Sequence, residues 1–242
     1  MSFIKKEYKQ LLIILVLFLA GLFLYTGKMI NPYIDFGDEI SYPVSILNNS
    51  VLYKHLYVPF GPLSYLFNAF LLKFFSVNLT TYYVIGSLNA FVILNLLYGI
   101  SRFFLDKTFS LLIVLYVMGN CVFVPHVMNY ITPYSYSIVY GLSSCFLSVL
   151  MFLNYLKTDK NKFLSVSCLF AGVAAVCKYE FCLYSVLLLI FIFYKSYKHS
   201  KVIVFLKNAS VCFCTFISIP FLTFASCFSD SFMPKSNTIC KS

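Results

Sequence analysis

Long apolar runs separated by short polar intervals dominate this chain of 242 residues. The runs cover residues 10–27, 62–75, 81–101, 109–124, 135–156, 163–177, 181–194 and 205–228. A helix needs about 20 apolar residues to cross a bilayer, and several runs reach or approach that length. The runs are also continuous, whereas membrane β-barrels show alternating segments of about 10 residues. The pattern therefore predicts an all-α, polytopic membrane helix bundle.

The composition excludes a soluble globular protein. Hydrophobic residues make up 61% of the chain and charged residues 11%, whereas soluble domains carry roughly 25% charged residues. The formal net charge of +10 could suggest a nucleic-acid partner. However, the lysines lie in short groups at the ends of apolar runs, as they do on the cytoplasmic side of membrane proteins. We therefore expect the lipid bilayer and lipid phosphates as partners, and no nucleic acid.

The N-terminal end resembles a signal peptide that is not removed. Lys5, Lys6 and Lys9 precede the first apolar run, and no convincing small-residue cleavage motif follows it. We expect an uncleaved signal anchor with a cytoplasmic N-terminus, in an integral protein of a bacterial inner or plasma membrane. The acidic interval 28–61 then lies on the outer side.

The short run 62–75 determines the topology of everything that follows it. If it spans, the lysine groups at 157–162 and 195–207 both fall outside, against the positive-inside rule. If it lies at the membrane surface, both groups fall inside, and runs this short are often interfacial. We therefore predict about seven spans plus surface-lying helices in the first outer loop; a short, tilted span at 62–75 remains the alternative. The transmembrane module is expected over 1–228, with a polar tail at 229–242.

The polar interval 35–65 holds most of the candidate chemistry. Asp35, Asp38 and Glu39 lie within five positions, and carboxylates in a membrane protein usually serve chemistry, ion handling or a loop in water. A second polar element, 171–181, ends an apolar helix with a charged turn. The recognisable patterns are Asp38-Glu39, Tyr42, Ile46-Leu47-x-Asn49, Leu52-Tyr53, Pro59-x-Gly61-Pro62-Leu63-x-Tyr65 and Lys178-Tyr179-Glu180.

In their order and spacing these patterns resemble the GT-C superfamily of integral membrane glycosyltransferases. The similarity covers about residues 5–200, and it is greatest to the bacterial branch akin to protein O-mannosyltransferases and lipid A aminoarabinose transferases. The resemblance implies transfer of a sugar from a polyprenyl-phosphate donor to an acceptor on the outer side of the membrane. The sequence itself shows no metal-binding cluster, so we expect no metal and no cofactor. Two features depart from the family. Val58 and Phe60 flank Pro59, where the aminoarabinose branch has a lysine, and the chain matches only the N-terminal part of the longer family enzymes.

The resemblance also implies a role for each candidate residue. Asp38 is the expected general base, which would take the proton of the acceptor hydroxyl. Glu39 would orient the acceptor or a partner group. Lys178, together with Lys54 or His55, would contact the leaving phosphate and stabilise its developing charge. The other expected substrate-binding residues are Asp35, Tyr65 and Glu180.

Each assignment has a structural alternative. Asp38 and Glu39 could solvate a loop, and Asp35 could cap a short helix that begins near Asp38. Lys178 could extend toward the membrane surface at a helix turn, and His55 could be ordinary interfacial polarity. The tyrosines of the next outer interval could stack on a sugar or form an interfacial belt: Tyr130, Tyr134, Tyr136 and Tyr140.

Two other function classes stay open on the sequence alone. A lipid-linked saccharide transporter or flippase would usually show inverted repeats and broken helices, and no such repeat is visible. An inactive, truncated remnant of a transferase is the other alternative. The nine cysteines show neither the spacing of a redox motif nor that of a zinc site, so we interpret them as small buried hydrophobic residues.

Overall fold

The computed structural model describes residues 2–25, 36–124 and 129–199, and these parts of the chain are helical without strands. The helices are α1 (Ser2–Tyr25), α2 (Phe36–Leu47), α3 (Pro62–Phe74), α4 (Leu79–Ser101), α5 (Lys107–Val117), α6 (Tyr136–Thr158), α7 (Asn161–Cys177) and α8 (Phe181–His199). A single π-helical turn, Met118–Val122, extends α5. The all-α prediction is confirmed for the described residues.

Three of these helices are long and apolar enough to cross a membrane: Glu7–Tyr25, Leu79–Ser101 and Tyr136–Thr158. The apolar segments Lys107–Val122, Asn161–Cys177 and Phe181–Tyr194 are shorter. The predicted membrane protein therefore has support from three helices, whereas seven spans are not established. The apolar run 205–228 lies outside the described residues.

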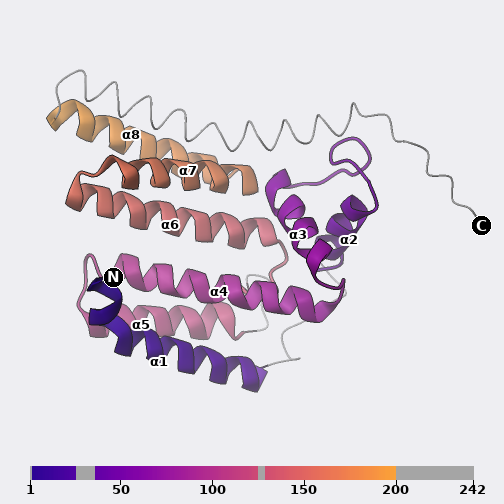
Figure 1. Cartoon of the computed structure of the whole chain (residues 1–242), viewed down its shortest axis with the longest axis horizontal. Coiled ribbons are helices and arrows are strands. Elements are labelled where there is room, and N and C mark those ends of the chain that lie inside the picture. The colour runs from indigo at the N-terminus through magenta and orange to yellow at the C-terminus, as the bar shows by residue number, and fades with distance from the viewer. Residues whose placement is uncertain (1, 26–35, 125–128, 200–242) are drawn as a thin grey trace, which may run out of the picture.

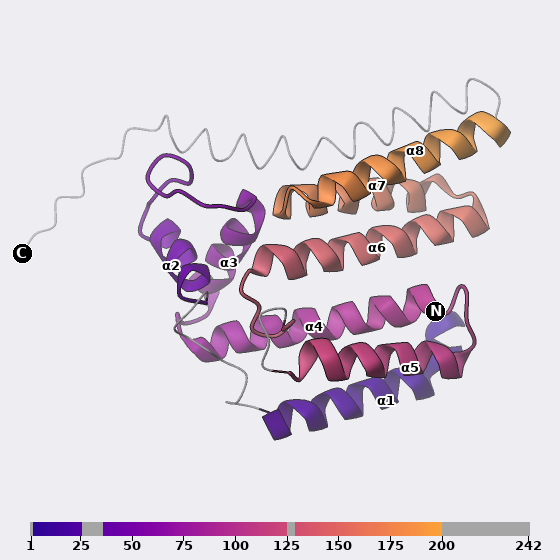
Figure 2. The same ribbon diagram turned by 180° about the vertical axis from the view of Figure 1, so that it is seen from behind.

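In Figure 1 the helices α1, α5, α4, α6, α7 and α8 follow one another across the view, and α2 and α3 lie together at one end of this row, which we call the layer. Figure 2 shows the same order from behind: α1, α5, α4, α6, α7 and α8. Helix α1 ends, and α4 begins, at the end of the layer that carries α2 and α3. The α4–α5 and α6–α7 connections lie at the opposite end. The predicted surface helices thus occupy one end of the layer, and the basic residues Arg102, Lys107 and Lys157 the other.

Local sequence signals explain several helix boundaries. Asn78 caps α4 by accepting a hydrogen bond from the Thr81 backbone N–H at 2.7 Å, and Asp106 caps α5 in the same way from Phe109 at 2.9 Å. Asn and Asp are favoured at this position because their side chains satisfy backbone donors that have no partner within the helix. Pro62 begins α3, where its missing N–H costs nothing.

Small residues and serines allow α6 and α7 to pack closely. The Ser148 hydroxyl donates to the Ser167 carbonyl at 2.7 Å, and the Ser167 hydroxyl donates to the Ser148 carbonyl at 2.9 Å. Ser185 of α8 donates to the carbonyl of Ala171 on α7 at 3.0 Å. Apolar helices in lipid associate through such close contacts and hydrogen bonds, because burial of apolar surface gains little there.

A buried acid fastens α1 to α4 and α5 at the end opposite α2 and α3. Glu7 is 1% exposed and lies 3.3 Å from the Arg102 guanidinium and 3.7 Å from the Lys107 ammonium. The Tyr98 hydroxyl donates a third contact at 2.8 Å. A buried carboxylate is tolerated only with such partners. Glu7 therefore links α1 to the end of α4 and the start of α5.

Candidate functional site

Helix α2, the turn after it and α3 form a small aromatic and aliphatic cluster at their end of the layer. Leu52, Val58 and Tyr65 are its buried residues, and Tyr42 packs against it. The rings of Tyr42 and Tyr65 meet edge to face with their centroids 5.4 Å apart. This packing holds the first turn of α2, which carries both acids of the Asp38-Glu39 pair, against the N-terminal end of α3.

Glu39 is almost completely buried, with 2% of its surface exposed. Its carboxylate accepts a hydrogen bond from the Tyr136 backbone N–H at 3.1 Å, and from the side chains of Ser135 and Tyr65. Burial raises the pKa of Glu39 from 4.5 to about 7 against the opposing effect of these donors, and the neighbouring charge of Asp38 raises it further. Because Tyr136 is the first residue of α6, Glu39 joins α2 to the start of that helix.

Lys178 lies between two aromatic rings directly after the end of α7. Its ammonium nitrogen is 5.0 Å from the ring centroid of Phe60 and 5.9 Å from that of Tyr134. It donates to the Tyr134 hydroxyl at 3.4 Å and pairs with the Glu180 carboxylate at 3.1 Å. The Lys178 side chain is 12% exposed, whereas that of Glu180 is 68% exposed, so an anionic ligand that displaces the exposed Glu180 carboxylate could take its place on the ammonium group.

Consecutive residues at the start of α6 contact the two charged groups. Tyr134 contacts Lys178, and Ser135 and Tyr136 donate to Glu39. Helix α2 and the charged turn after α7, which are far apart in the sequence, therefore both contact one short segment. This juxtaposition is the candidate functional site.

Gly61 provides the second link between these elements. Its backbone N–H donates to the Cys177 carbonyl at 3.2 Å, and a Cβ atom at this position would lie 1.7 Å from the Val176 carbonyl oxygen. Only glycine permits this approach of α3 to the end of α7. The contact places Phe60 and Lys178, which adjoin the two bonded residues, beside each other.

One buried amide that sequence reasoning missed organises the segment leading to the site. The Asn129 side chain donates to the Val122 carbonyl at 2.7 Å and accepts from the Ile131 backbone N–H at the same distance. A Cβ atom on Gly86 would lie 1.8 Å from the Ile131 carbonyl oxygen, so α4 packs directly against this segment. In the sequence, Asn129 and Gly86 are recognisable only as an asparagine and a glycine among apolar residues. That pattern does not show which atoms each of them contacts.

The other predicted site residues are distributed unevenly. Asp38 is exposed beside the buried Glu39. Lys54 and His55 are exposed in the turn between α2 and α3, where the His55 Nδ1 accepts from the Val51 backbone N–H at 3.1 Å. Asp35 lies outside the described residues. The site therefore unites Glu39 with Tyr65, and Lys178 with Glu180, whereas Lys54 and His55 are exposed in the turn between α2 and α3.

The tyrosines that could have formed a stacking surface or a belt differ in their surroundings. Tyr136 and Tyr140 are buried, and the Tyr140 hydroxyl donates to Asn68 at 2.6 Å. The Tyr136 hydroxyl donates to the Tyr82 carbonyl at 2.9 Å. These two rings belong to the core, whereas the half-buried Tyr134 ring lies at the site.

A cavity of about 870 Å³ lies next to the site, among α3, α4, α6 and α7. Ser64 and Cys177, which adjoin the α3 and α7 ends of the site, are among its lining residues. None of the predicted site residues that the structure describes lines it. The cavity and the charged groups are therefore neighbouring but separate features.

The burial of Glu39 predicts a pH-dependent stability. A pKa of about 7 in the folded state, against 4.5 as the ordinary value, means that the folded protein holds a proton that the unfolded chain releases between these pH values. Folding stability should then fall as pH rises through this window, by roughly 3 kcal/mol for this group. Glu39→Gln should flatten this part of the pH profile, as measured by the midpoint of thermal unfolding between pH 4.5 and 8 in detergent.

Glu180→Gln is the matched control, because it makes the same chemical change at an exposed position at the same end of the layer. In Glu180→Gln the folding stability should fall with rising pH as much as it does in the wild type. A wild-type midpoint that is constant from pH 4.5 to 8 would show that Glu39 is not a buried acid of this kind.

In comparisons with known proteins, no family model, no curated protein and no solved structure matches this chain.

Proposed function

We propose that this chain is a membrane glycosyltransferase, or the N-terminal part of one, that moves a sugar from a polyprenyl-phosphate donor to an acceptor hydroxyl. The observation that carries the proposal is that Glu39 and Lys178 contact neighbouring residues of the segment 134–136: Glu39 accepts from the Tyr136 N–H, and Lys178 donates to the Tyr134 hydroxyl. This arrangement puts a carboxylate pair and a cation at one end of a helical layer. General-base catalysis and stabilisation of a leaving phosphate need these two kinds of group.

The two acids of the pair suit different roles. Asp38 is exposed and is open to an acceptor hydroxyl. Glu39 is enclosed, and the donors around it hold its carboxylate in place. In the proposed reaction the acceptor oxygen bonds to the anomeric carbon as the bond from that carbon to the phosphate oxygen breaks. The phosphate keeps the electron pair, and Asp38 takes the proton. Glu39 acts as a positioning residue for α2.

The charge distribution favours the outer side of the membrane for this site. Arg102, Lys107 and Lys157 lie at the opposite end of the layer, which the positive-inside rule assigns to the cytoplasm. In this topology α3 is an interfacial helix, and α1 is the signal anchor that leads to the site from the cytoplasmic side.

A transfer assay in reconstituted membranes tests the proposal. The full chain is supplied with labelled polyprenyl-phosphate sugars and total membrane acceptors, and donor binding is measured separately by equilibrium competition. We expect transfer by the wild type, and about tenfold weaker donor binding by Lys178→Gln, since a partly desolvated charge-assisted contact is worth roughly 1.5–3 kcal/mol.

Lys73→Gln is the control, because Lys73 is an exposed lysine at the end of α3 and its loss removes the same charge outside the site. Its donor affinity should equal that of the wild type. Absence of transfer from every donor, combined with equal donor binding by Lys178→Gln and wild type, would contradict the proposed function.

A further inference from the structure

The peptide group between Phe60 and Gly61 is held at both of its ends. Its N–H, which belongs to Gly61, donates to the Cys177 carbonyl at 3.2 Å. Its carbonyl, which belongs to Phe60, accepts from the Tyr53 hydroxyl at 3.1 Å. Because a peptide group is planar and rigid, the two contacts together fix its orientation. Tyr53 therefore acts on the same peptide group that joins the start of α3 to the end of α7.

The orientation of this peptide group directs the Phe60 side chain. The Phe60 ring lies 5.0 Å from the Lys178 ammonium nitrogen. It also meets the Tyr134 ring at an angle of 70°, with the two centroids 6.3 Å apart. A contact between a cation and an aromatic face is stronger where water is excluded, and the Lys178 side chain is 12% exposed. The Phe60 ring is thus one wall of the space around the Lys178 ammonium group.

Tyr53 has an unusual backbone conformation. Its φ angle is 62°, in the left-handed region that bulky residues rarely adopt. The turn around it is held by hydrogen bonds from the Tyr53 N–H to the Leu56 carbonyl and from the His55 N–H to the Val51 carbonyl, both at 2.9 Å. Strain of this kind persists only where the surrounding contacts impose it, and it is common at functional sites.

Packing in the core does not account for a tyrosine at this position. The buried residues of the turn are Leu52 and Val58, which are 5% and 4% exposed, whereas Tyr53 is 46% exposed. The apolar cluster under the turn includes Phe60 as a partly buried member. The strained residue therefore contributes chiefly through its hydroxyl, which reaches a carbonyl seven positions later.

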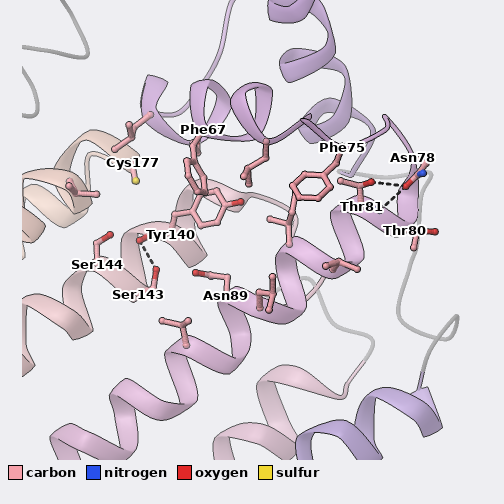
Figure 3. A pocket seen from close by; sticks show the side chains of 18 of the residues that line it. Phe67, Phe75, Asn78, Thr80, Thr81, Asn89, Tyr140, Ser143, Ser144 and Cys177 are labelled. Carbon is pink, nitrogen blue, oxygen red and sulfur yellow. Dashed lines mark hydrogen bonds between the residues drawn. The ribbon is translucent and has the colours of Figure 1, made fainter. Parts of the chain in front are cut away.

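The Tyr53 contact is separate from the neighbouring cavity. Cys177 lines that cavity together with Phe67 and Tyr140 (Figure 3). Tyr53 and Phe60 are not among the described residues that line it. A change at the Tyr53 hydroxyl therefore leaves the cavity lining as it is, and its effects report on the surroundings of Lys178.

We propose that Tyr53 is a positioning residue of the candidate functional site, whose hydroxyl holds the Phe60–Gly61 peptide group so that the Phe60 ring lies against Lys178. The consequence for the reaction rests on the proposed function, in which Lys178 contacts the phosphate of the donor. Without the hydroxyl the peptide group is free to turn. The ammonium group of Lys178 then loses one wall and gains water, and its contact with an anion becomes weaker.

Tyr53→Phe tests this role, because it removes the hydroxyl and keeps the ring. The first measurement needs no ligand. The full chain in nanodiscs is treated with a trace of acetic anhydride, and the acetylation rate of Lys178 is measured by mass spectrometry relative to that of Lys73, an exposed lysine at the end of α3. We expect about threefold faster acetylation of Lys178, which is the scale of one neutral hydrogen bond, with little change in the thermal midpoint.

The second measurement is the affinity for a polyprenyl phosphate, determined by equilibrium competition. Tyr53→Phe should weaken this affinity about threefold. In a Lys178→Gln background the same substitution should have no further effect, because the group that Tyr53 positions is absent. A general loss of structure would instead lower the affinity in both backgrounds.

Tyr57→Phe is the matched control, because it makes the same chemical change in the same turn, at a side chain that is 87% exposed. It should leave the acetylation of Lys178 and the affinity as in the wild type. Unchanged acetylation of Lys178 in Tyr53→Phe would overturn the proposal, and so would equal losses of affinity in the two backgrounds.

The outcomes separate this inference from the proposed function. Faster acetylation of Lys178 in Tyr53→Phe, without sugar transfer by the wild type, would support the positioning role and count against the transferase. Sugar transfer by the wild type, combined with unchanged acetylation in Tyr53→Phe, would overturn the positioning role and leave the transferase intact.

Discussion

Asp38→Asn should reduce the rate of sugar transfer by about 10²–10⁴-fold, which is the usual contribution of a general base. Asparagine keeps the size of the side chain and its hydrogen-bonding capacity, but its amide cannot take the proton of the acceptor hydroxyl. The loss corresponds to roughly 3–5 kcal/mol of transition-state stabilisation. Because Asp38 is exposed at the start of α2, the folded structure and donor binding should remain close to those of the wild type. Single-turnover transfer and donor competition, measured on the same membranes, check both parts.

The comparison with another aspartate makes this result specific. Asp159 ends α6 at the opposite end of the layer, in a left-handed backbone conformation (φ 52°) that asparagine also adopts readily. Asp159→Asn should therefore transfer sugar at the wild-type rate. Wild-type transfer by Asp38→Asn would reject Asp38 as the base, and a loss confined to donor affinity would assign it to binding instead.

Gly61→Ala should severely reduce the amount of folded protein. The added Cβ atom would lie 1.7 Å from the Val176 carbonyl oxygen and 2.9 Å from that of Cys177. These are backbone atoms and cannot rotate away, so α3 and the end of α7 must separate. Overpacking usually lowers folding stability by about 1–3 kcal/mol. We expect a loss at the upper end of this range or above it, because the neighbouring backbone cannot move aside easily. The thermal midpoint and the monodisperse fraction in size-exclusion chromatography should both fall. Any folded remainder should lose donor affinity, because the separation displaces Lys178 from Phe60.

Gly37→Ala isolates the effect of the contact from that of the glycine. Among the described residues outside its own helix, no atom lies within 4 Å of a Cβ placed on Gly37. Gly37 is the second residue of α2, and alanine is a better helix former than glycine. It should be neutral or stabilising. Equal stability of Gly61→Ala and wild type would mean that α3 does not approach α7 as closely as the structure shows.

Several helix boundaries were predictable because they depend on local chemistry. The apolar run 62–75 corresponds to Pro62–Phe74, and 163–177 ends at the same residue as Asn161–Cys177. Proline at the start of a helix and the charged turn at Lys178 act within a few residues of the chain, so no knowledge of distant partners is needed. The number of spans was less accessible, because hydropathy does not distinguish a short span from a helix packed inside the bundle.

The candidate site was predictable only in part. The sequence drew attention to the acidic pair and to Lys178, but it could not separate an exposed Asp38 from a buried Glu39 at adjacent positions. Helical geometry turns neighbouring side chains by about 100°, so one can face the protein while the next faces solvent. Asn129 and Gly86 were missed because their contacts form only when the loop before α6 folds onto α4. The Asn129 side chain then hydrogen-bonds to backbone atoms of that loop, and Gly86 leaves space for the Ile131 carbonyl oxygen.

By itself, the sequence determined that the described part of the chain is all-α with membrane-compatible helices, where several of those helices begin or end, and which charged residues stand apart from the apolar runs. Hydrophobicity and capping are properties of short segments, and they survive without a tertiary structure. Only the tertiary structure decided that Glu39 and Lys178 contact neighbouring residues at the start of α6, that Glu7 is paired with Arg102, and that a cavity without charged lining residues lies beside α3. These features depend on contacts between residues separated by tens of positions, and their energies arise from burial and close packing that no local pattern encodes.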